Sequence, residues 1–230
     1  METTPTNGSS GIQLRQETLA SVLACYRGVS WRERLHVGLR ARMMKLWSLE
    51  GEVPRRGRIL DLGAGQGLVA LTLALIGPER EVIGIEREER KVGAAKTAAV
   101  GLANLSFRQG NILELSETDV FDVVLLVDVL YLWREAEKRR ILQNAHDILR
   151  QRGLLLVHEV TTEPRLKYAF AVFQEWVALH ILRTTAAAEL HYISREENES
   201  LLRSCGFEVE SIPVHQGMPY PHHLFRCCRV

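Results

Sequence analysis

A short glycine-rich segment places the strongest constraint on how this chain folds. Residues 59–67 have the sequence Ile-Leu-Asp-Leu-Gly-Ala-Gly-Gln-Gly, an apolar run that leads into three alternating glycines. Residues 68–76 are almost entirely apolar and end before Gly77 and Pro78, which predicts a helix. Glycine lets the backbone turn tightly and lets a ligand approach without a clash against Cβ. The segment therefore predicts a strand, a ligand-binding turn and a helix.

Strands and helices alternate from this segment to the C-terminus. Strands are predicted at 58–61, 81–86, 104–109, 120–128 and 153–160, and helices at 87–101, 135–150 and 163–183. A capping box at 194–197 opens a last helix, and two closing strands follow at 207–214 and 223–230. Alternation of this kind indicates an α/β protein with a mostly parallel sheet that is covered on both faces. The closing pair, which no helix separates, indicates one antiparallel strand.

The first 53 residues do not follow this alternation. Residues 1–13 are polar and predict a flexible tail without a secretory signal. Two helical patterns follow at 14–27 and 31–49, the second with apolar residues four apart at Leu35, Leu39, Met43 and Trp47. Residues 1–60 hold ten basic and five acidic side chains, so the difference is +5. We expect a helical cap at 14–53 on a domain at 54–230, in one compact unit.

Composition excludes several classes of protein. Hydrophobic residues make up 46% and charged residues 25% of the 230 residues, which excludes a disordered or collagen-like chain. The formal net charge is +1, so no nucleic-acid partner is expected. The longest apolar stretch, between residues 167 and 183, is too short and too polar for a transmembrane helix. Neither the histidines nor the four cysteines have the spacing of a metal site, and we expect reduced thiols in a cytoplasmic protein.

The spacing of the glycines distinguishes between two nucleotide-like cofactors. Dinucleotide-binding turns have the pattern G-x-G-x-x-G, and counting from Gly63 places Leu68 where that pattern has its third glycine. The run here is D-x-G-x-G-x-G, with Asp61 two residues before the first glycine. A carboxylate there suits a cationic ligand group better than a pyrophosphate. A nicotinamide-dependent oxidoreductase is therefore disfavoured.

This run resembles the first motif of class I S-adenosylmethionine-dependent methyltransferases of the bacterial small-molecule type. Glu86 lies 86 − 61 = 25 residues after Asp61, Gly110-Asn111-Ile112 follows the third predicted strand, and 121–130 resembles the fourth motif. The family usually has Asp where this chain has Asn111. The resemblance covers 54–160 well. It implies a Rossmann-like, seven-stranded sheet of order 3-2-1-4-5-7-6 with strand 7 antiparallel.

The resemblance also implies a site for S-adenosylmethionine, whose product is S-adenosylhomocysteine. Glu86 is expected to bind both ribose hydroxyls, since a carboxylate accepts from two adjacent O–H groups. Asn111 is expected to accept from the adenine amino group, and the end of 121–130 to approach the methionine part. The expected cofactor-binding residues are Asp61, Gly63, Ala64, Gly65, Gly67, Glu86, Arg87, Asn111, Ile112, Asp128 and Val129.

Catalytic groups are expected at the carboxyl ends of the later strands and in the loops beside them. Methyl transfer to a hydroxyl requires a base, and Glu159 is the first candidate, followed by His222 and His223, with His158 behind them. Since strand neighbours alternate, one of His222 and His223 is expected to face outward. The alternative for Glu159 is an ion pair with Arg165 or Lys167. Expected substrate-pocket residues are Tyr26, Trp31, Tyr131 and Tyr220.

These expectations favour O-methylation of a small hydrophobic metabolite. The metabolite is expected to be lipid-like, polyketide-like or carrier-bound, and the protein to be a monomer or a homodimer. Carbon or nitrogen methylation shares the same sequence features. The +5 excess suggests an RNA or protein methyltransferase as an alternative, and Asn111 suggests a non-catalytic protein that binds S-adenosylmethionine. The Asn/Asp-Pro-Pro-Tyr signature of enzymes that methylate amino groups and nucleic-acid bases is absent, because Asp128-Val129-Leu130-Tyr131 occupies that place.

Overall fold

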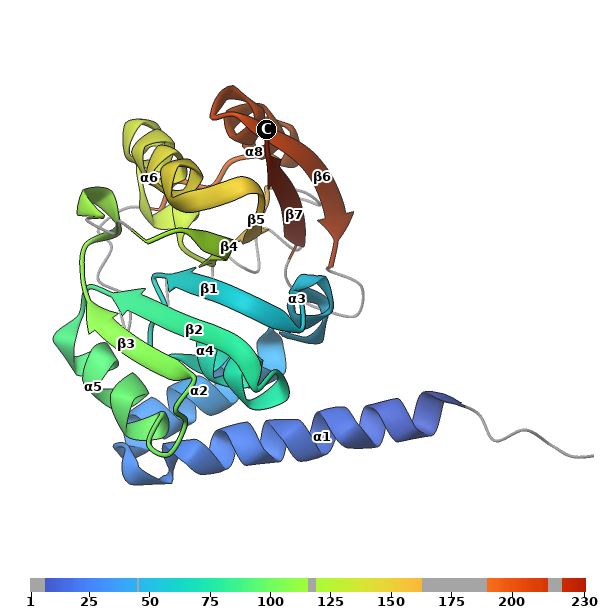
Figure 1. Ribbon diagram of the computed structural model, residues 1–230, viewed down its shortest axis with the longest axis vertical. Coiled ribbons are helices and arrows are strands. Elements are labelled where there is room, and N and C mark those ends of the chain that lie inside the picture. Colours follow the sequence, from blue (N-terminus) through green and yellow to red (C-terminus); the bar gives the residue numbers. More distant parts are fainter. Residues whose placement is uncertain (1–6, 45, 116–118, 163–189, 215–220) are drawn as a thin grey trace, which may run out of the picture.

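A single seven-stranded sheet forms the centre of the computed structural model, which describes residues 7–44, 46–115, 119–162, 190–214 and 221–230 (Figure 1). The strand order is β3-β2-β1-β4-β5-β7-β6. The strands are β1 Arg56–Leu62, β2 Glu79–Glu86, β3 Leu105–Gln109, β4 Phe121–Val127, β5 Leu149–Val160, β6 Phe207–Pro213 and β7 His222–Arg229. Neighbours are parallel, except that β7 runs antiparallel to β5 and β6. The predicted fold class, strand order and antiparallel strand are confirmed.

Helices cover both faces of this sheet (Figure 1). The first face carries α1 Asn7–Cys25, α2 Trp31–Met43, α3 Leu46–Glu52, α4 Leu68–Ile76 and α5 Glu89–Ala98. The second face carries α6 Glu135–Ile148 and α8 Arg195–Ser204. Short 3₁₀ turns lie at η1 Tyr26–Gly28, η2 Ile112–Glu114 and η3 Leu130–Leu132. Among the described residues, no helix combines the length and apolar character needed to cross a membrane.

Alternation along the strands decides which face each candidate residue shares. In β1, Ile59 packs in the core under α1–α5 and Leu60 packs in the core under α6 and α8. Asp61 therefore points to the same face as Ile59. In β5 the same rule places His158 on the first face and Glu159 on the second.

The N-terminal helices differ from the sequence-based prediction. The helix predicted at 31–49 is two helices, because Met44 has an extended backbone between α2 and α3. The predicted apolar stripe is also turned toward solvent, since Leu35 and Leu39 are exposed, whereas Glu33 and Val37 are buried. α1 begins at Asn7, inside the predicted tail. The helix predicted at 163–183 lies outside the described residues.

Candidate active site at the carboxyl edge of the sheet

Three glycines shape the turn that follows β1. Gly63, Gly65 and Gly67 all have positive φ values, of 77°, 57° and 83°. A Cβ on Gly63 would lie 2.7 Å from Cγ2 of Val129, and a Cβ on Gly67 would lie 2.4 Å from Cζ of Phe107. A Cβ on Gly65 would meet only Nη1 of Arg40, at 3.5 Å. Gly63 and Gly67 therefore permit close packing, while the buried Gly65 lies under the guanidinium of Arg40.

Asp61 supplies a buried carboxylate beside this turn. Asp61 is 2% exposed, and its Oδ2 has no hydrogen-bond partner among the residues that the structure describes. Burial raises the pKa of Asp61 to about 7, although the positive charge of Arg40 lowers it. A buried acceptor without a donor is costly, so an unpaired carboxylate oxygen at this edge suits a ligand that brings a cationic donor.

Glu86 joins the end of β2 to the glycine turn. Its Oε2 accepts a hydrogen bond from the backbone N–H of Gly65 and its Oε1 accepts one from the backbone N–H of Glu88, both at 2.9 Å. A carboxylate has about four acceptor positions, so two remain for ligand hydroxyl groups. The neighbouring Arg87 is exposed, and its guanidinium lies 5.9 Å from the ring centroid of Trp133.

Asn111 caps the short turn after β3. Its Oδ1 accepts a hydrogen bond from the backbone N–H of Leu113 at 3.1 Å, and Ile112 between them is buried. A carbonyl oxygen has two lone pairs, so this contact leaves one for a further donor. Asp61, the glycines, Glu86 and Asn111 thus all lie at the carboxyl ends of β1, β2 and β3, the edge where ligands bind in open α/β sheets.

Side chains of the N-terminal helices contact the glycine turn directly. The hydroxyl of Tyr26 donates to the backbone carbonyl of Gln66 at 2.9 Å. The amide of Gln66 donates to Glu33 at 2.8 Å, and Glu33 is also paired with Arg90. The cap and the turn are therefore held together by buried polar contacts.

The structure places the expected pocket residues in different surroundings. Tyr26 is buried against the turn, Trp31 is 68% exposed beside Arg32, and Tyr131 stacks on Tyr192 with ring centroids 4.9 Å apart. Tyr220 lies outside the described residues. Whether these residues line a substrate pocket therefore stays a prediction.

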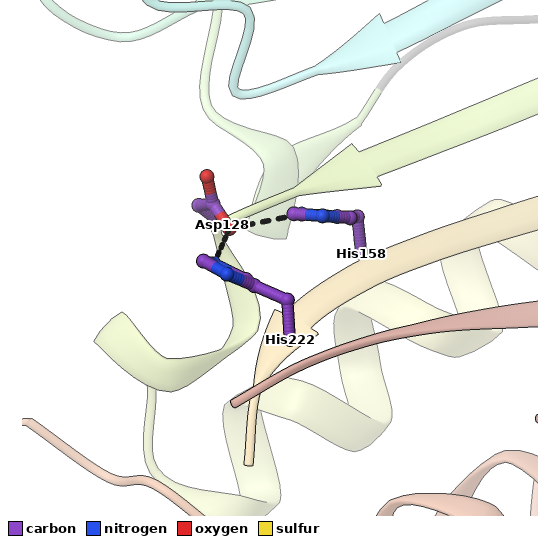
Figure 2. A group of neighbouring side chains, drawn as sticks. All are labelled: Asp128, His158 and His222. Carbon is purple, nitrogen blue, oxygen red and sulfur yellow. Dashed lines mark hydrogen bonds and ion pairs between the residues drawn. The ribbon is translucent and has the colours of Figure 1, made fainter. Parts of the chain in front are cut away.

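Asp128 and two histidines form a cluster at the ends of β4, β5 and β7 (Figure 2). Oδ1 of Asp128 lies 3.2 Å from Nδ1 of His158 and 3.4 Å from Nε2 of His222. Burial acts to raise the pKa of Asp128, but the two imidazoles, His158 foremost, hold it well below its usual range. Burial lowers the pKa of His158. The cluster therefore holds an ionised carboxylate against two imidazoles.

The backbone and the rings of this cluster have unusual geometry. Asp128 has a φ of 56°, a left-handed conformation that costs energy in a residue other than glycine and is concentrated at functional sites. The rings of His158 and His222 are stacked, with centroids 4.5 Å apart and an interplanar angle of 22° (Figure 2). A metal ion lies in the plane of each imidazole that binds it, and these planes face each other. The observed arrangement thus suits hydrogen bonding better than joint ligation of one ion.

Glu159 lies on the other face of the sheet and has a different set of partners. Its Oε1 accepts hydrogen bonds from the backbone N–H groups of Val129 and Leu130 at the start of η3. Burial, together with the charge of Asp128, raises the pKa of Glu159 to about 8. The alternative partners, Arg165 and Lys167, lie outside the described residues. The observed contacts make Glu159 a cap for this turn.

His222 and His223 point to opposite faces, as alternation requires, but neither faces solvent. Their residues are 9% and 7% exposed, so both faces of the sheet are covered at the start of β7. Nδ1 of His223 lies 3.1 Å from the hydroxyl of Thr161. The expectation that one of the pair faces outward is therefore wrong, because a residue on either face of the sheet is buried here.

Arg40 and Glu33 are site residues that the sequence analysis did not identify. Both project from α2 toward the glycine turn, where Arg40 contacts Asp128 and Glu33 contacts Gln66. The signal was present, since Glu33, Val37, Arg40 and Ala41 have helical spacing and share one face. The more regular spacing of Leu35 and Leu39 favoured a different face of this helix in the prediction.

Comparison with known proteins assigns the chain to a family. Residues 55–201 match the family model described as "Methyltransferase domain", and the chain belongs to this methyltransferase family. A release factor glutamine methyltransferase of Aliivibrio fischeri is 37% identical over 81 residues, which are 34% of this chain and 28% of that relative. The chain therefore spans less than a third of this curated relative's length.

Solved structures agree with this assignment at the level of the fold. An O-methyltransferase family protein from Burkholderia thailandensis has a TM-score of 0.69 at 18% identity, covering 96% of this chain and 70% of its own. The S-adenosylmethionine-dependent methyltransferase SibL has a TM-score of 0.66 at 19% identity, covering 97% of this chain and 71% of its own. Membership in the family makes S-adenosylmethionine the cofactor, and the unpaired Asp61 oxygen beside the glycine turn fits its ammonium group.

Proposed function

We propose that this protein transfers the methyl group of S-adenosylmethionine to an oxygen atom of a small-molecule acceptor. The observation that carries the proposal is the Asp128–His158–His222 cluster, which puts two imidazoles beside the expected cofactor site. The O-methyltransferase family neighbour supports the same type of acceptor.

The residues at the carboxyl ends of β1–β3 would hold the cofactor. Asp61 would accept from its ammonium group, Glu86 from its ribose hydroxyls, and the 110–112 segment would contact its adenine. Bound there, the cofactor supplies a sulfonium that carries an electrophilic methyl group. Since this group is already activated, the protein must align the acceptor, exclude water and remove a proton.

The cluster is arranged to take that proton. The ionised carboxylate of Asp128 favours hydrogen on Nδ1 of His158 and on Nε2 of His222, so the opposite nitrogen of each ring is the basic atom. The side chain of His222 is 11% exposed and that of His158 is 3% exposed, so His222 is the one that would meet the acceptor. As the acceptor oxygen takes up the methyl group, its proton would pass to His222.

The basic excess of the N-terminal segment does not favour a nucleic-acid substrate. Arg40 is paired with Asp128, Arg56 with Glu79, and Arg58 with Glu81 and Asp119. These partners all lie beyond residue 60, so part of the +5 excess is neutralised within the fold. We therefore propose a metabolite as the acceptor.

Product mass spectrometry with a panel of acceptors tests this function. The protein would be incubated with methyl-deuterated S-adenosylmethionine and hydroxylated aromatic and aliphatic compounds, and fragmentation would locate the label. We expect the label on oxygen, and label on nitrogen or carbon would contradict the proposed acceptor. Failure to bind S-adenosylhomocysteine in calorimetry would contradict the function as a whole.

A matched pair of variants tests the proton acceptor. His222→Gln is expected to lower kcat by about 10²- to 10⁴-fold and to leave the affinity for S-adenosylhomocysteine unchanged, because a general base contributes that much. His223→Gln changes the adjacent buried histidine, which contacts Thr161, and is expected to lower kcat less than tenfold. Equal losses in the two variants would contradict the role of His222.

A further inference from the structure

Arg40 brings a positive charge from the N-terminal cap to the glycine turn. Its Nη2 donates to the carbonyl oxygen of Val127 at 3.2 Å and to Oδ2 of Asp128 at 3.3 Å. Its Nη1 lies 3.5 Å from the point that a Cβ on Gly65 would occupy. The guanidinium therefore lies above the turn, between the end of β1 and the end of β4.

Asp61 lies at the end of β1, within electrostatic reach of Arg40. Its Oδ2 is buried without a donor among the described residues; burial raises the pKa of Asp61, and the charge of Arg40 lowers it. An α-amino acid group carries an ammonium and a carboxylate on one carbon atom. An acid and an arginine at the same glycine turn are complementary to such a group.

We propose that Arg40 binds the α-carboxylate of the methionine part of the cofactor, with Asp61 receiving the ammonium group. The inference rests on the proposed function and adds a cofactor-binding residue from outside the segment that matches the family model. A guanidinium binds a carboxylate with two parallel hydrogen bonds, so Arg40 would both hold and orient the methionine part.

The contact of Arg40 with Asp128 does not prevent this role. The two side chains are 26% and 20% exposed, so water reaches this partly buried pair. Asp128 keeps the contacts with His158 and His222 when the guanidinium turns to a second carboxylate. Arg40 thus exchanges one carboxylate for another when the cofactor binds.

Calorimetry with two ligands isolates the carboxylate. S-Adenosylhomocysteine carries it, and the decarboxylated analogue S-adenosyl-3-thiopropylamine keeps the adenosine, the sulfur and the amine. For the wild-type protein we expect S-adenosylhomocysteine to bind about 10- to 100-fold more tightly than the analogue, because hydrogen bonds to a charged group are strong. In Arg40→Gln we expect S-adenosylhomocysteine to lose this advantage while the analogue binds within about twofold of wild type.

Controls separate this inference from a structural role of Arg40 and from the proposed function. Arg42→Gln changes an exposed arginine of the same helix and is expected to keep the wild-type preference. Equal weakening of both ligands by Arg40→Gln, or a preference that persists in it, would overturn the inference and leave the function standing. If the wild type bound neither ligand, the proposed function itself would fail.

A second substitution keeps the test decisive if the glutamine variant does not fold. Arg40→Lys retains the charge and an ion-pair partner for Asp128 but loses the planar fork of the guanidinium. We expect it to reduce the preference for S-adenosylhomocysteine about 3- to 10-fold and to leave the analogue unaffected. An unchanged preference in Arg40→Lys would contradict the two-bond contact.

Discussion

The carboxylate of Glu86 accepts a hydrogen bond from the backbone N–H of Gly65 at 2.9 Å and so ties the end of β2 to the turn after β1. Its other oxygen accepts from Glu88, at the start of α5. The side chain that would receive the ribose hydroxyls is thus also the one that holds the glycine turn in place. The shape of the turn and the recognition of the ligand would therefore both depend on the carboxylate of Glu86.

Glu86→Gln is expected to weaken binding of S-adenosylhomocysteine about 10- to 100-fold. The amide keeps one acceptor oxygen but replaces the other with a donor, which disrupts its contact with a backbone N–H and its contacts with ribose hydroxyls. Isothermal titration calorimetry measures the change. Glu89→Gln, an exposed substitution in the first turn of α5, serves as the control and should bind as wild type. Wild-type affinity in Glu86→Gln would contradict the ribose assignment.

Asp61 predicts a pH dependence of cofactor binding. In the ligand-free protein its pKa is about 7, so between pH 5.5 and 7 most of this carboxyl group is protonated, whereas an ammonium ligand favours its ionised form. Affinity for S-adenosylhomocysteine should therefore rise with pH across this range, by at most tenfold per pH unit. Asp61→Asn should bind more weakly and show a flatter profile. A wild-type slope in the variant would assign the pH dependence to another group.

Glu159→Gln tests the role that the structure gives to this side chain. The amide oxygen can still accept from Val129 and Leu130, so we expect kcat to remain within about fivefold of wild type, whereas loss of a general base costs about 10²- to 10⁴-fold. The measurement is the initial rate with the acceptor found in the product screen. A loss of a hundredfold or more with unchanged cofactor affinity would restore Glu159 as the base.

The same substitution predicts a change in stability with pH. The pKa of Glu159 is raised from 4.5 to about 8, so between these values the unfolded chain has released a proton that the folded chain keeps. The free energy of unfolding therefore falls as the pH rises through this window, and the contribution of Glu159 is fully lost above pH 8. Urea denaturation at pH 5, 6.5 and 8 should show a smaller fall for Glu159→Gln. An identical fall would contradict the raised pKa.

Tyr26→Phe tests the contact between the cap and the glycine turn. The substitution removes the hydroxyl that donates to Gln66 and leaves a buried carbonyl without this partner, at a cost of about 1–3 kcal/mol. For a chain of this size the melting temperature should fall by roughly 2–10 °C. Trp31→Phe, at an exposed position of α2, should have the same melting temperature as the wild type. Equal melting temperatures for all three proteins would show that the contact contributes nothing.

The elements that could be predicted are those whose signal is local. The strand, turn and helix around Gly63–Gly67 follow from hydrophobic runs and from glycines that all have positive φ. The order of the seven strands followed from the resemblance to a family, because the neighbours of a strand are distant in sequence. The burial of both His222 and His223 depends on what covers the two faces of the sheet and could not be predicted from the alternation of β7 alone.

The residues that sequence reasoning missed act over long separations. Arg40 contacts Asp128, 88 residues away, and no local pattern records such a contact. Glu159 was expected to be a base because it is a carboxylate at the end of a predicted strand, where catalytic groups are expected. Its partners are backbone N–H groups of η3, whose direction depends on the left-handed conformation of Asp128. Its role as a base stays a prediction, and its backbone partners could not be predicted because sequence does not distinguish backbone groups.

The segment before β1 contributes Tyr26, Glu33 and Arg40 to the surroundings of the glycine turn, although the family match begins only at residue 55. We therefore expect a chimaera that joins a different leading segment to the same sheet to change the binding of S-adenosylmethionine as well as the packing of the N-terminal helices.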